Sequence, residues 1–292
     1  MAGSTNLQVA ALNIVASPHP SGIYPELLRA AAGAEIPIWG SDYAKITSPL
    51  RIEDRPGLYT GQILVWAQID TNGRWLNKRK DVEATAEEMQ EIEEALPPDF
   101  EPNFRRFTYL LDESEHLLLI EVRNEFGHNL SPHRAERFFF RLMESLPEKW
   151  PDVDVTVVPE DDTLEKIFSI PRLVKLEILI KRPNADDVGD DFNRIMEGMA
   201  EEGAKSWRIE KIKAPKEKTL KPNDDTKRMA AVAATNGTVS GKGKDESGSP
   251  VFESTAEHPK IRRVELITSS FGAVLSALRF FSKAVAKSST GD

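Results

Sequence analysis

The stretch from Arg105 to Leu146 constrains the fold of this chain more than any other. Apolar runs at Phe107–Leu111 and Leu117–Val122 flank a short polar turn, a pattern that predicts an antiparallel hairpin. An amphipathic helix is expected next, with Ser131 as its N-cap and Pro132 at its first position. A hairpin followed by a capped helix indicates a sheet that is covered by helices.

Elements around this stretch extend the pattern. Strands are expected at Gln8–Ala16, Ala44–Ile52, Tyr59–Asp70 and Val153–Val157, and a helix is expected at Pro25–Ala32. Their order contains the split βαβ unit of ferredoxin-like folds. We therefore expect an α+β protein with mixed or antiparallel sheets and helices on one face.

The second half of the chain also alternates between expected strands and expected helices. Its expected elements are helices at Thr163–Phe168, Asp190–Glu202, Asp224–Thr235 and Ser269–Lys287, and strands at Arg172–Lys181, Lys205–Ile212, Thr238–Lys242 and Pro250–Ser254. We predict two ferredoxin-like halves, residues 1–160 and 161–292. The C-terminal helix is predicted to pack on the fold, with docking onto a second copy as the alternative.

An acidic segment interrupts the first half. Residues 78–101 hold nine acidic and three basic residues, and Thr85 and Glu88 have the spacing of a capping box. Its apolar stripe is thin. The segment predicts a solvent-exposed acidic helix, and the alternative is a docking face for a basic partner.

Composition excludes several classes of protein. The chain has no cysteine, which removes thiolate catalysis, cysteine-ligated zinc and iron–sulfur clusters. Its net charge of -9 argues against binding nucleic acid over the whole surface. No apolar run reaches the roughly 18 residues of a membrane span. We expect a cytoplasmic protein without a membrane contact or cofactor.

The first basic candidate is a row of arginines on the predicted helix. Arg134, Arg137 and Arg141 fall within a sector of about 60°, beside the apolar face. Guanidinium groups there could bind a phosphate or carboxylate, with His133 in the first turn nearby. The alternative is local ion pairing with Glu136 and with Glu144.

The second basic candidate is residues 205–221, the most basic run of the chain. It could bind phosphates, and it could equally be an edge strand that lysines protect from aggregation. The proposed contacts in this strip are Lys205, Trp207, Arg208, Lys211 and Lys213.

Catalysis has weaker support. His128 and His133 with Arg134 would suffice in kind for metal-independent RNA cleavage, in which one group is a base and another an acid. Their spacing matches no known signature. Whether the protein is an enzyme therefore stays open, and we favour a protein without catalytic activity. Three of the four Asp–Asp pairs fall at or immediately before an expected helix start, a position that favours acidic residues without a metal.

Five short segments resemble a bacterial family catalogued only as a domain of unknown function. They are Leu12–Ile14, Gly61–Ile63, Ile167–Leu173, Lys181–Asp187 and Ser254–Pro259. The resemblance covers nearly the whole chain and implies no catalytic residues. It implies a setting near phage-defence or toxin–antitoxin genes.

We expect a non-catalytic binding protein that engages a nucleic acid or a protein partner, and the family resemblance implies a bacterial defence system as its setting. The alternatives are the histidine-pair ribonuclease and an architectural subunit. In the latter, the acidic helix and the C-terminal helix are the docking surfaces of a homo-oligomer.

Overall fold

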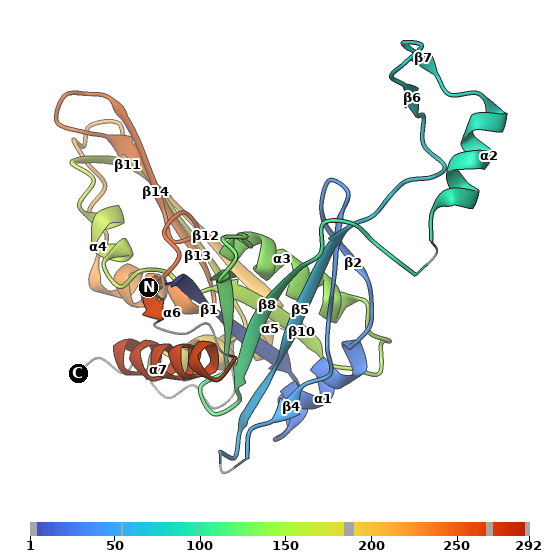
Figure 1. Cartoon of the computed structure of the whole chain (residues 1–292). Helices are drawn as coiled ribbons and strands as arrows, with labels where there is room; N and C mark the ends of the chain where they lie inside the picture. Colours follow the sequence, from blue (N-terminus) through green and yellow to red (C-terminus); the bar gives the residue numbers. More distant parts are fainter. Residues whose placement is uncertain (1–4, 54, 98, 184–189, 267–270, 290–292) are drawn as a thin grey trace.

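The computed structural model describes residues 5–53, 55–97, 99–183, 190–266 and 271–289 (Figure 1). Within them, the strands form a nine-stranded sheet, a four-stranded sheet and a two-stranded sheet. All pairings are antiparallel, and helices lie against both larger sheets. The α+β class is therefore confirmed.

The main sheet has the strand order β10-β1-β9-β8-β5-β3-β2, with β15 beside β1 and β4 beside β5. Its strands are β1 (Thr5–Ser17), β2 (Ile36–Trp39), β3 (Asp42–Ile46), β4 (Leu50–Arg51), β5 (Leu58–Ala67), β8 (Arg105–Asp112), β9 (Leu117–Arg123), β10 (Asp152–Val157) and β15 (Ile261–Leu266). The predicted hairpin is β8–β9, and its residues Phe107 and Tyr109 are buried in the core.

Strand β1 is central because its side chains are apolar on both faces. Leu12 and Ile14 belong to the cluster below helices α1 (Ile23–Ala31) and α3 (Pro132–Glu144). Leu7 and Val9 belong to the cluster below α7 (Phe271–Ser289) on the other face. A strand that is buried on both sides has a continuous apolar run, which is what the sequence has here.

The main sheet therefore differs from the expectation of helices on one face. Helix α7 packs over β1, β8 and β9 on the side opposite α1 and α3. Its apolar stripe, including Leu278 and Phe281, is used in this packing, as predicted for the C-terminal helix. The start of the predicted C-terminal helix, residues 269 and 270, lies outside the described residues.

The smaller sheet has the order β12-β11-β13-β14 and carries its own core. Its elements are α4 (Thr163–Phe168), β11 (Arg172–Lys181), α5 (Asp190–Glu202), β12 (Ser206–Ile212), α6 (Asp224–Thr235), β13 (Gly237–Lys244) and β14 (Pro250–Ser254). A Cβ atom at Gly241 would lie 2.9 Å from Ile167, so glycine lets α4 pack closely on β13.

The two ferredoxin-like halves are not confirmed. In the main sheet, α3 connects β9 to β10, and the antiparallel strand β1 lies between these two strands. This is the split arrangement. In the smaller sheet, α5 instead joins β11 and β12, which are neighbours. The chain also returns to the main sheet with β15 and α7, although both belong to the predicted second half.

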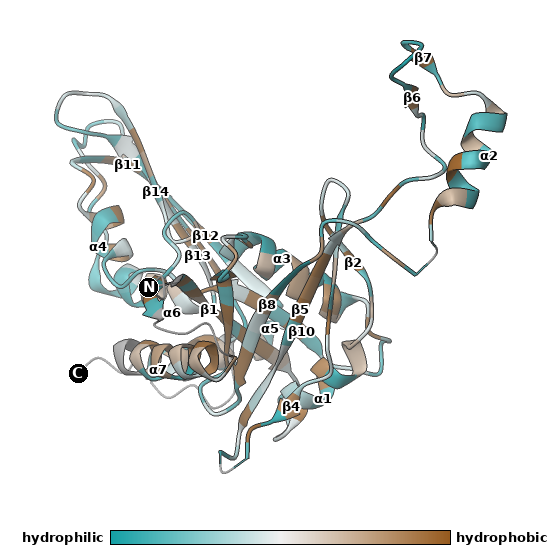
Figure 2. Cartoon of the chain, in the orientation of Figure 1, coloured by the Kyte–Doolittle hydropathy of each residue, from teal (hydrophilic) through white to brown (hydrophobic). Residues whose placement is uncertain are grey.

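Residues 68–97 and 99–104 form a projection that stands away from the body, and we call it the arm (Figure 1). The predicted solvent-exposed helix of the acidic segment 78–101 is α2, which spans Ala86–Ala95. A two-stranded ribbon, β6 (Leu76–Asn77) and β7 (Val82–Glu83), precedes it. Thr85 and Glu88 form the predicted capping box, and this box sets the start of the helix. Figure 2 shows hydrophilic residues over much of α2.

Candidate functional site

The N-terminus of α3 has few free backbone donors. Ser131 caps the helix, because its hydroxyl oxygen accepts a hydrogen bond from the Arg134 N–H at 3.3 Å. Pro132 has no N–H to offer. Two of the first three helical positions therefore cannot donate to an anion, and the arginine side chains become the important groups.

The arginine row, Arg134, Arg137 and Arg141, lies beside β2, the outermost strand of the main sheet. The guanidinium of Arg141 donates to the carbonyl oxygen of Pro37 at 3.1 Å. The guanidinium of Arg134 lies 5.1 Å from the ring centre of Trp39, a cation–π contact. Contacts at both ends thus hold the row against the sheet edge.

No carboxylate pairs with any of the three arginines within the described part of the chain. Glu136, the predicted local partner, instead binds His133, with Oε2 at 3.2 Å from Nδ1. Trp39 is 61% exposed, so one face of its ring is open to solvent. The local ion pairing that we kept as an alternative is absent here.

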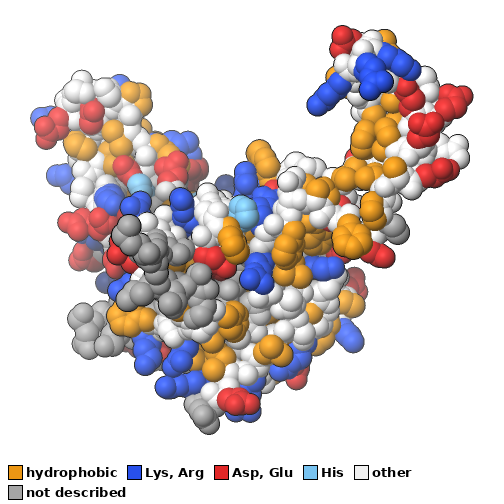
Figure 3. Space-filling model, in the orientation of Figure 1, with side chains coloured by type: hydrophobic (Ala, Val, Ile, Leu, Met, Phe, Trp, Pro, Cys, Tyr) orange, Lys and Arg blue, Asp and Glu red, His pale blue; other side chains and the backbone are white. Residues whose placement is uncertain are grey.

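The space-filling view places basic side chains and a histidine around the hollow between the arm and the smaller sheet (Figure 3). Helix α3 contacts β2 of the main sheet and lies near β11 of the smaller sheet. Trp39 of β2 meets it on one side, and Lys181 of β11 lies over its Phe140 ring on the other, at 5.7 Å. Arg137 and Arg141 are exposed and Arg134 is half-buried, so the row is accessible to a ligand.

His133 faces the loop between β14 and β15. Its hydrogen bond with Glu136, and a backbone hydrogen bond with Ala256, raise the pKa of the imidazole above its ordinary value despite partial burial. The raised pKa favours the positively charged form. Since Arg137 is close enough to oppose this charge, His133 can add to the positive potential beside the row.

The predicted histidine pair is not brought together. His128 is exposed, and its Nδ1 lies 3.4 Å from the side-chain amide of Asn124. Phe126 is its ring neighbour, with centroids 6.3 Å apart. Among the described residues, no hydrogen bond or ring contact joins His128 to His133. A base and an acid that act on one phosphate would need to converge.

The proposed contacts of the basic run 205–221 lie in residues 205–213, which we call the lysine strip, and these do not form one surface. Lys216, Lys218 and Lys221 follow the strip and are exposed. Along β12 the side chains alternate, so Trp207 and Lys211 face α5 and α6 while Arg208 points to the other side of the sheet. Lys205 pairs with Asp152 at 3.1 Å, and Lys211 donates to the Thr226 hydroxyl.

The remaining contacts of the strip are equally local. Lys213 donates to the carbonyl oxygens of Ala214 and Glu217, and the Trp207 indole N–H donates to Glu202 at 2.7 Å. Most of these polar groups are therefore already occupied.

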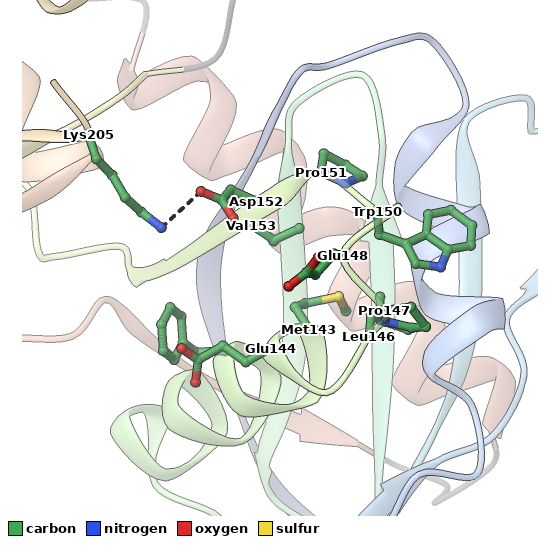
Figure 4. Close-up of a pocket in the computed structure, with 11 residues that line it drawn as sticks. Met143, Glu144, Leu146, Pro147, Glu148, Trp150, Pro151, Asp152, Val153 and Lys205 are labelled. Atoms are coloured by element: carbon green, nitrogen blue, oxygen red, sulfur yellow. Dashed lines mark hydrogen bonds and ion pairs between the residues drawn. The ribbon is translucent and has the colours of Figure 1, made fainter. Parts of the chain in front are cut away.

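A pocket of about 320 Å³ lies between the C-terminal end of α3 and Lys205 (Figure 4). Its rim carries three carboxylates, those of Glu144, Glu148 and Asp152, and Lys205 points across to Asp152. The indole of Trp150 points away from the pocket. An acidic rim disfavours phosphate, so this pocket is not a continuation of the arginine row.

A buried carboxyl lies between β8 and β9. Glu121 is 2% exposed, and its Oε2 accepts a hydrogen bond from the Thr108 N–H at 2.8 Å. Its Oε1 has no hydrogen-bond partner among the described residues. Burial raises the pKa of Glu121 to about 7. The hydrogen bond from Thr108 and the charge of nearby Arg106 only partly oppose this shift.

No cluster of three or more metal-ligating side chains is found in the part of the chain that the structure describes. The acidic pairs are held by basic residues instead, as Asp225 is by Arg194 at 3.0 Å and Asp161 by Lys260 at 2.7 Å. Asp186 and Asp187 lie outside the described residues.

The family model that matches this chain is described as a domain of unknown function, DUF4747, and covers residues 5–282. The chain belongs to the DUF4747 family. The sequence resemblance is thereby confirmed. A comparison with curated proteins finds no match. Across the described residues, no helix has both the length and the apolar character that a bilayer crossing demands.

The main site residue that the sequence did not reveal is Trp39. It lies 95 positions before Arg134, in a four-residue strand that was not predicted. The only signal was a tryptophan directly before a Gly40–Ser41 turn. An aromatic side chain at the end of a short strand, next to a turn, tends to stay exposed, so Trp39 is available for contacts at the surface.

Proposed function

We propose that this protein is a non-catalytic nucleic-acid-binding component that holds a single strand along the arginine row. One observation carries the proposal: three guanidinium groups without carboxylate partners lie in line beside an exposed tryptophan. Guanidinium groups bind phosphates in a bidentate manner, and an exposed aromatic ring stacks a base. A duplex would hide its bases from Trp39, which favours a single strand.

The rest of the molecule limits where nucleic acid can bind. With a net charge of -9, most of the surface repels phosphate, and the lysine strip is tied up in local contacts. Binding should therefore depend on the row and weaken as salt is added.

The histidine-pair ribonuclease is less favoured, because His133 is bound to Glu136 and His128 to Asn124. RNA should therefore remain intact when it is incubated with the protein. We also propose that the protein acts in the cytoplasm, which its composition suggests. A role in a bacterial defence system is proposed from the family resemblance.

Fluorescence anisotropy with labelled single-stranded RNA, single-stranded DNA and duplexes tests the proposal. We expect single strands to bind more tightly than duplexes, with an affinity that falls steeply as salt rises. A flat salt response, or no binding of any probe at low salt, would contradict it. Gel analysis of the same RNA samples in EDTA would reveal cleavage if the ribonuclease alternative held.

A further inference from the structure

The arm has no core of its own. None of the described residues between 68 and 104 is buried, and none belongs to a hydrophobic cluster. Polar contacts hold it together, such as the two hydrogen bonds from Arg74 to Glu83 at 2.7 Å and the ion pair of Lys80 with Glu88 at 2.8 Å. Exposed contacts of this kind contribute little to order.

Apolar side chains on the arm are also uncovered. Leu76 is 62% exposed, Val82 51% and Phe100 77%. Helix α2 has only ten residues, fewer than an isolated helix needs to be stable in water. An element like this gains order when another surface covers it.

Helix α2 presents a row of three carboxylates that matches the arginine row. Glu87, Glu91 and Glu94 recur at steps of four and three residues, so they fall within a sector of about 60°. No basic residue pairs with them in the described part of the chain. The apolar residues Met89 and Ile92 lie on the opposite side of the helix.

The arginine row has the steps of the glutamate row in reverse: three residues from Arg134 to Arg137, then four to Arg141. Two helices that run antiparallel would therefore bring the three acids opposite the three bases. Figure 1 shows α2 held far from α3 of the same chain, so the partner helix must come from elsewhere.

We propose that α2 of one copy of this protein docks antiparallel on α3 of a second copy, with Glu87, Glu91 and Glu94 against the arginine row. A two-fold axis makes the contact twice, since each copy carries both rows. The arm thereby covers the same groups that bind nucleic acid, so self-association and nucleic-acid binding exclude each other. Only this exclusion rests on the proposed function.

Charge reversal tests the docking directly. Two variants are made, one with Glu87→Lys, Glu91→Lys and Glu94→Lys, the other with Arg134→Glu, Arg137→Glu and Arg141→Glu. Light scattering should find wild type at the mass of two chains and each variant at the mass of one. An equal mixture of the two variants should recover the two-chain mass, because both contacts then join opposite charges.

A matched control reverses three exposed glutamates elsewhere, with Glu197→Lys, Glu201→Lys and Glu246→Lys, and should keep the two-chain mass. Recovery in the mixture shows that both variants are folded. A wild type that stays at one chain at every concentration, or a mixture that stays at one chain, would overturn the docking.

Adding a single-stranded oligonucleotide to the wild-type dimer separates the two proposals. If both hold, the complex contains one protein chain. If no oligonucleotide binds to the dimer or to the variant with Glu87→Lys, Glu91→Lys and Glu94→Lys, the nucleic-acid function fails while the docking stands. If the oligonucleotide binds and the protein keeps its two-chain mass, the shared site is overturned.

Discussion

The arginine row of α3 and the lysine strip of β12 have similar charge in the sequence but different surroundings in the structure. The arginines project from one side of a helix whose other side is buried through Phe138 and Phe139, so they stay together. Lys205, Lys211 and Lys213 lie along or beside an edge strand and contact Asp152, the Thr226 hydroxyl and backbone carbonyls, while Arg208 lies on the opposite face of the sheet. The geometry of the backbone, more than the number of charges, determines which positive groups remain available.

The largest expected effect is on the stability of the protein, through the core residues on which α3 packs. Phe138 is fully buried beneath α3, so Phe138→Ala should lower the free energy of unfolding by about 3–5 kcal/mol. Phe126→Ala is the control, since Phe126 is 66% exposed and should change stability by less than about 0.5 kcal/mol. Urea denaturation measures both. Equal effects would show that α3 is not anchored as described.

Glu121 differs from the exposed charges of the row and the strip, because its burial favours the neutral carboxyl over the carboxylate. Its pKa of about 7 in the fold exceeds the ordinary 4.5, so the folded protein keeps a proton that the unfolded chain releases. Stability should therefore fall as pH rises from about 4.5 to 7 and then level off. Compared with Glu121→Gln, the wild type should lose up to about 3 kcal/mol over this window.

The measurement is urea denaturation of both proteins at pH 4.5, 6 and 8. The difference between their unfolding free energies should change in favour of the Gln variant as pH rises. A constant difference would mean that Glu121 is not desolvated.

Trp39 distinguishes the row from a simple patch of positive charge. Trp39→Ala should weaken binding of single strands by about 1–3 kcal/mol, the value of one stacked base. Trp39→Phe keeps a ring and should retain most of the affinity. Anisotropy titrations at fixed salt provide the comparison. Equal affinities for all three proteins would remove stacking from the account.

His133 should have the smallest effect. Its pKa is raised above 6.5, so the imidazole gains its charge as pH falls through that raised value, and binding beside Arg137 should tighten. A single charge that is shared with Glu136 should change affinity by about threefold. His133→Gln should remove this dependence between pH 6 and 8. An unchanged pH profile would place His133 outside the binding surface.

Local signals predicted the elements that position the row. Ser131 and Pro132 marked the start of α3, and the alternating apolar residues marked the β8–β9 hairpin. Both depend on neighbours in the sequence, which is why pattern alone sufficed.

Long-range pairing was beyond the sequence. Strand β2 has four residues and includes a proline, and β15 pairs with β1 across more than 250 positions. The contact of Trp39 with Arg134 depends on such pairings. The helix of the arm was predicted through its capping box, whereas the ribbon before it was missed, because the acidic composition gives no signal for the turn at Asp81, where φ is 54°.

The most direct test compares salt slopes for two variants with the same change of charge. One carries Arg134→Gln, Arg137→Gln and Arg141→Gln, and the other Lys205→Gln, Lys211→Gln and Lys213→Gln. For a single strand, the account predicts that losing the row reduces the slope of log affinity against log salt by about 2, whereas losing the strip leaves it unchanged. Equal slopes for the two variants, or a larger loss from the strip, would contradict it.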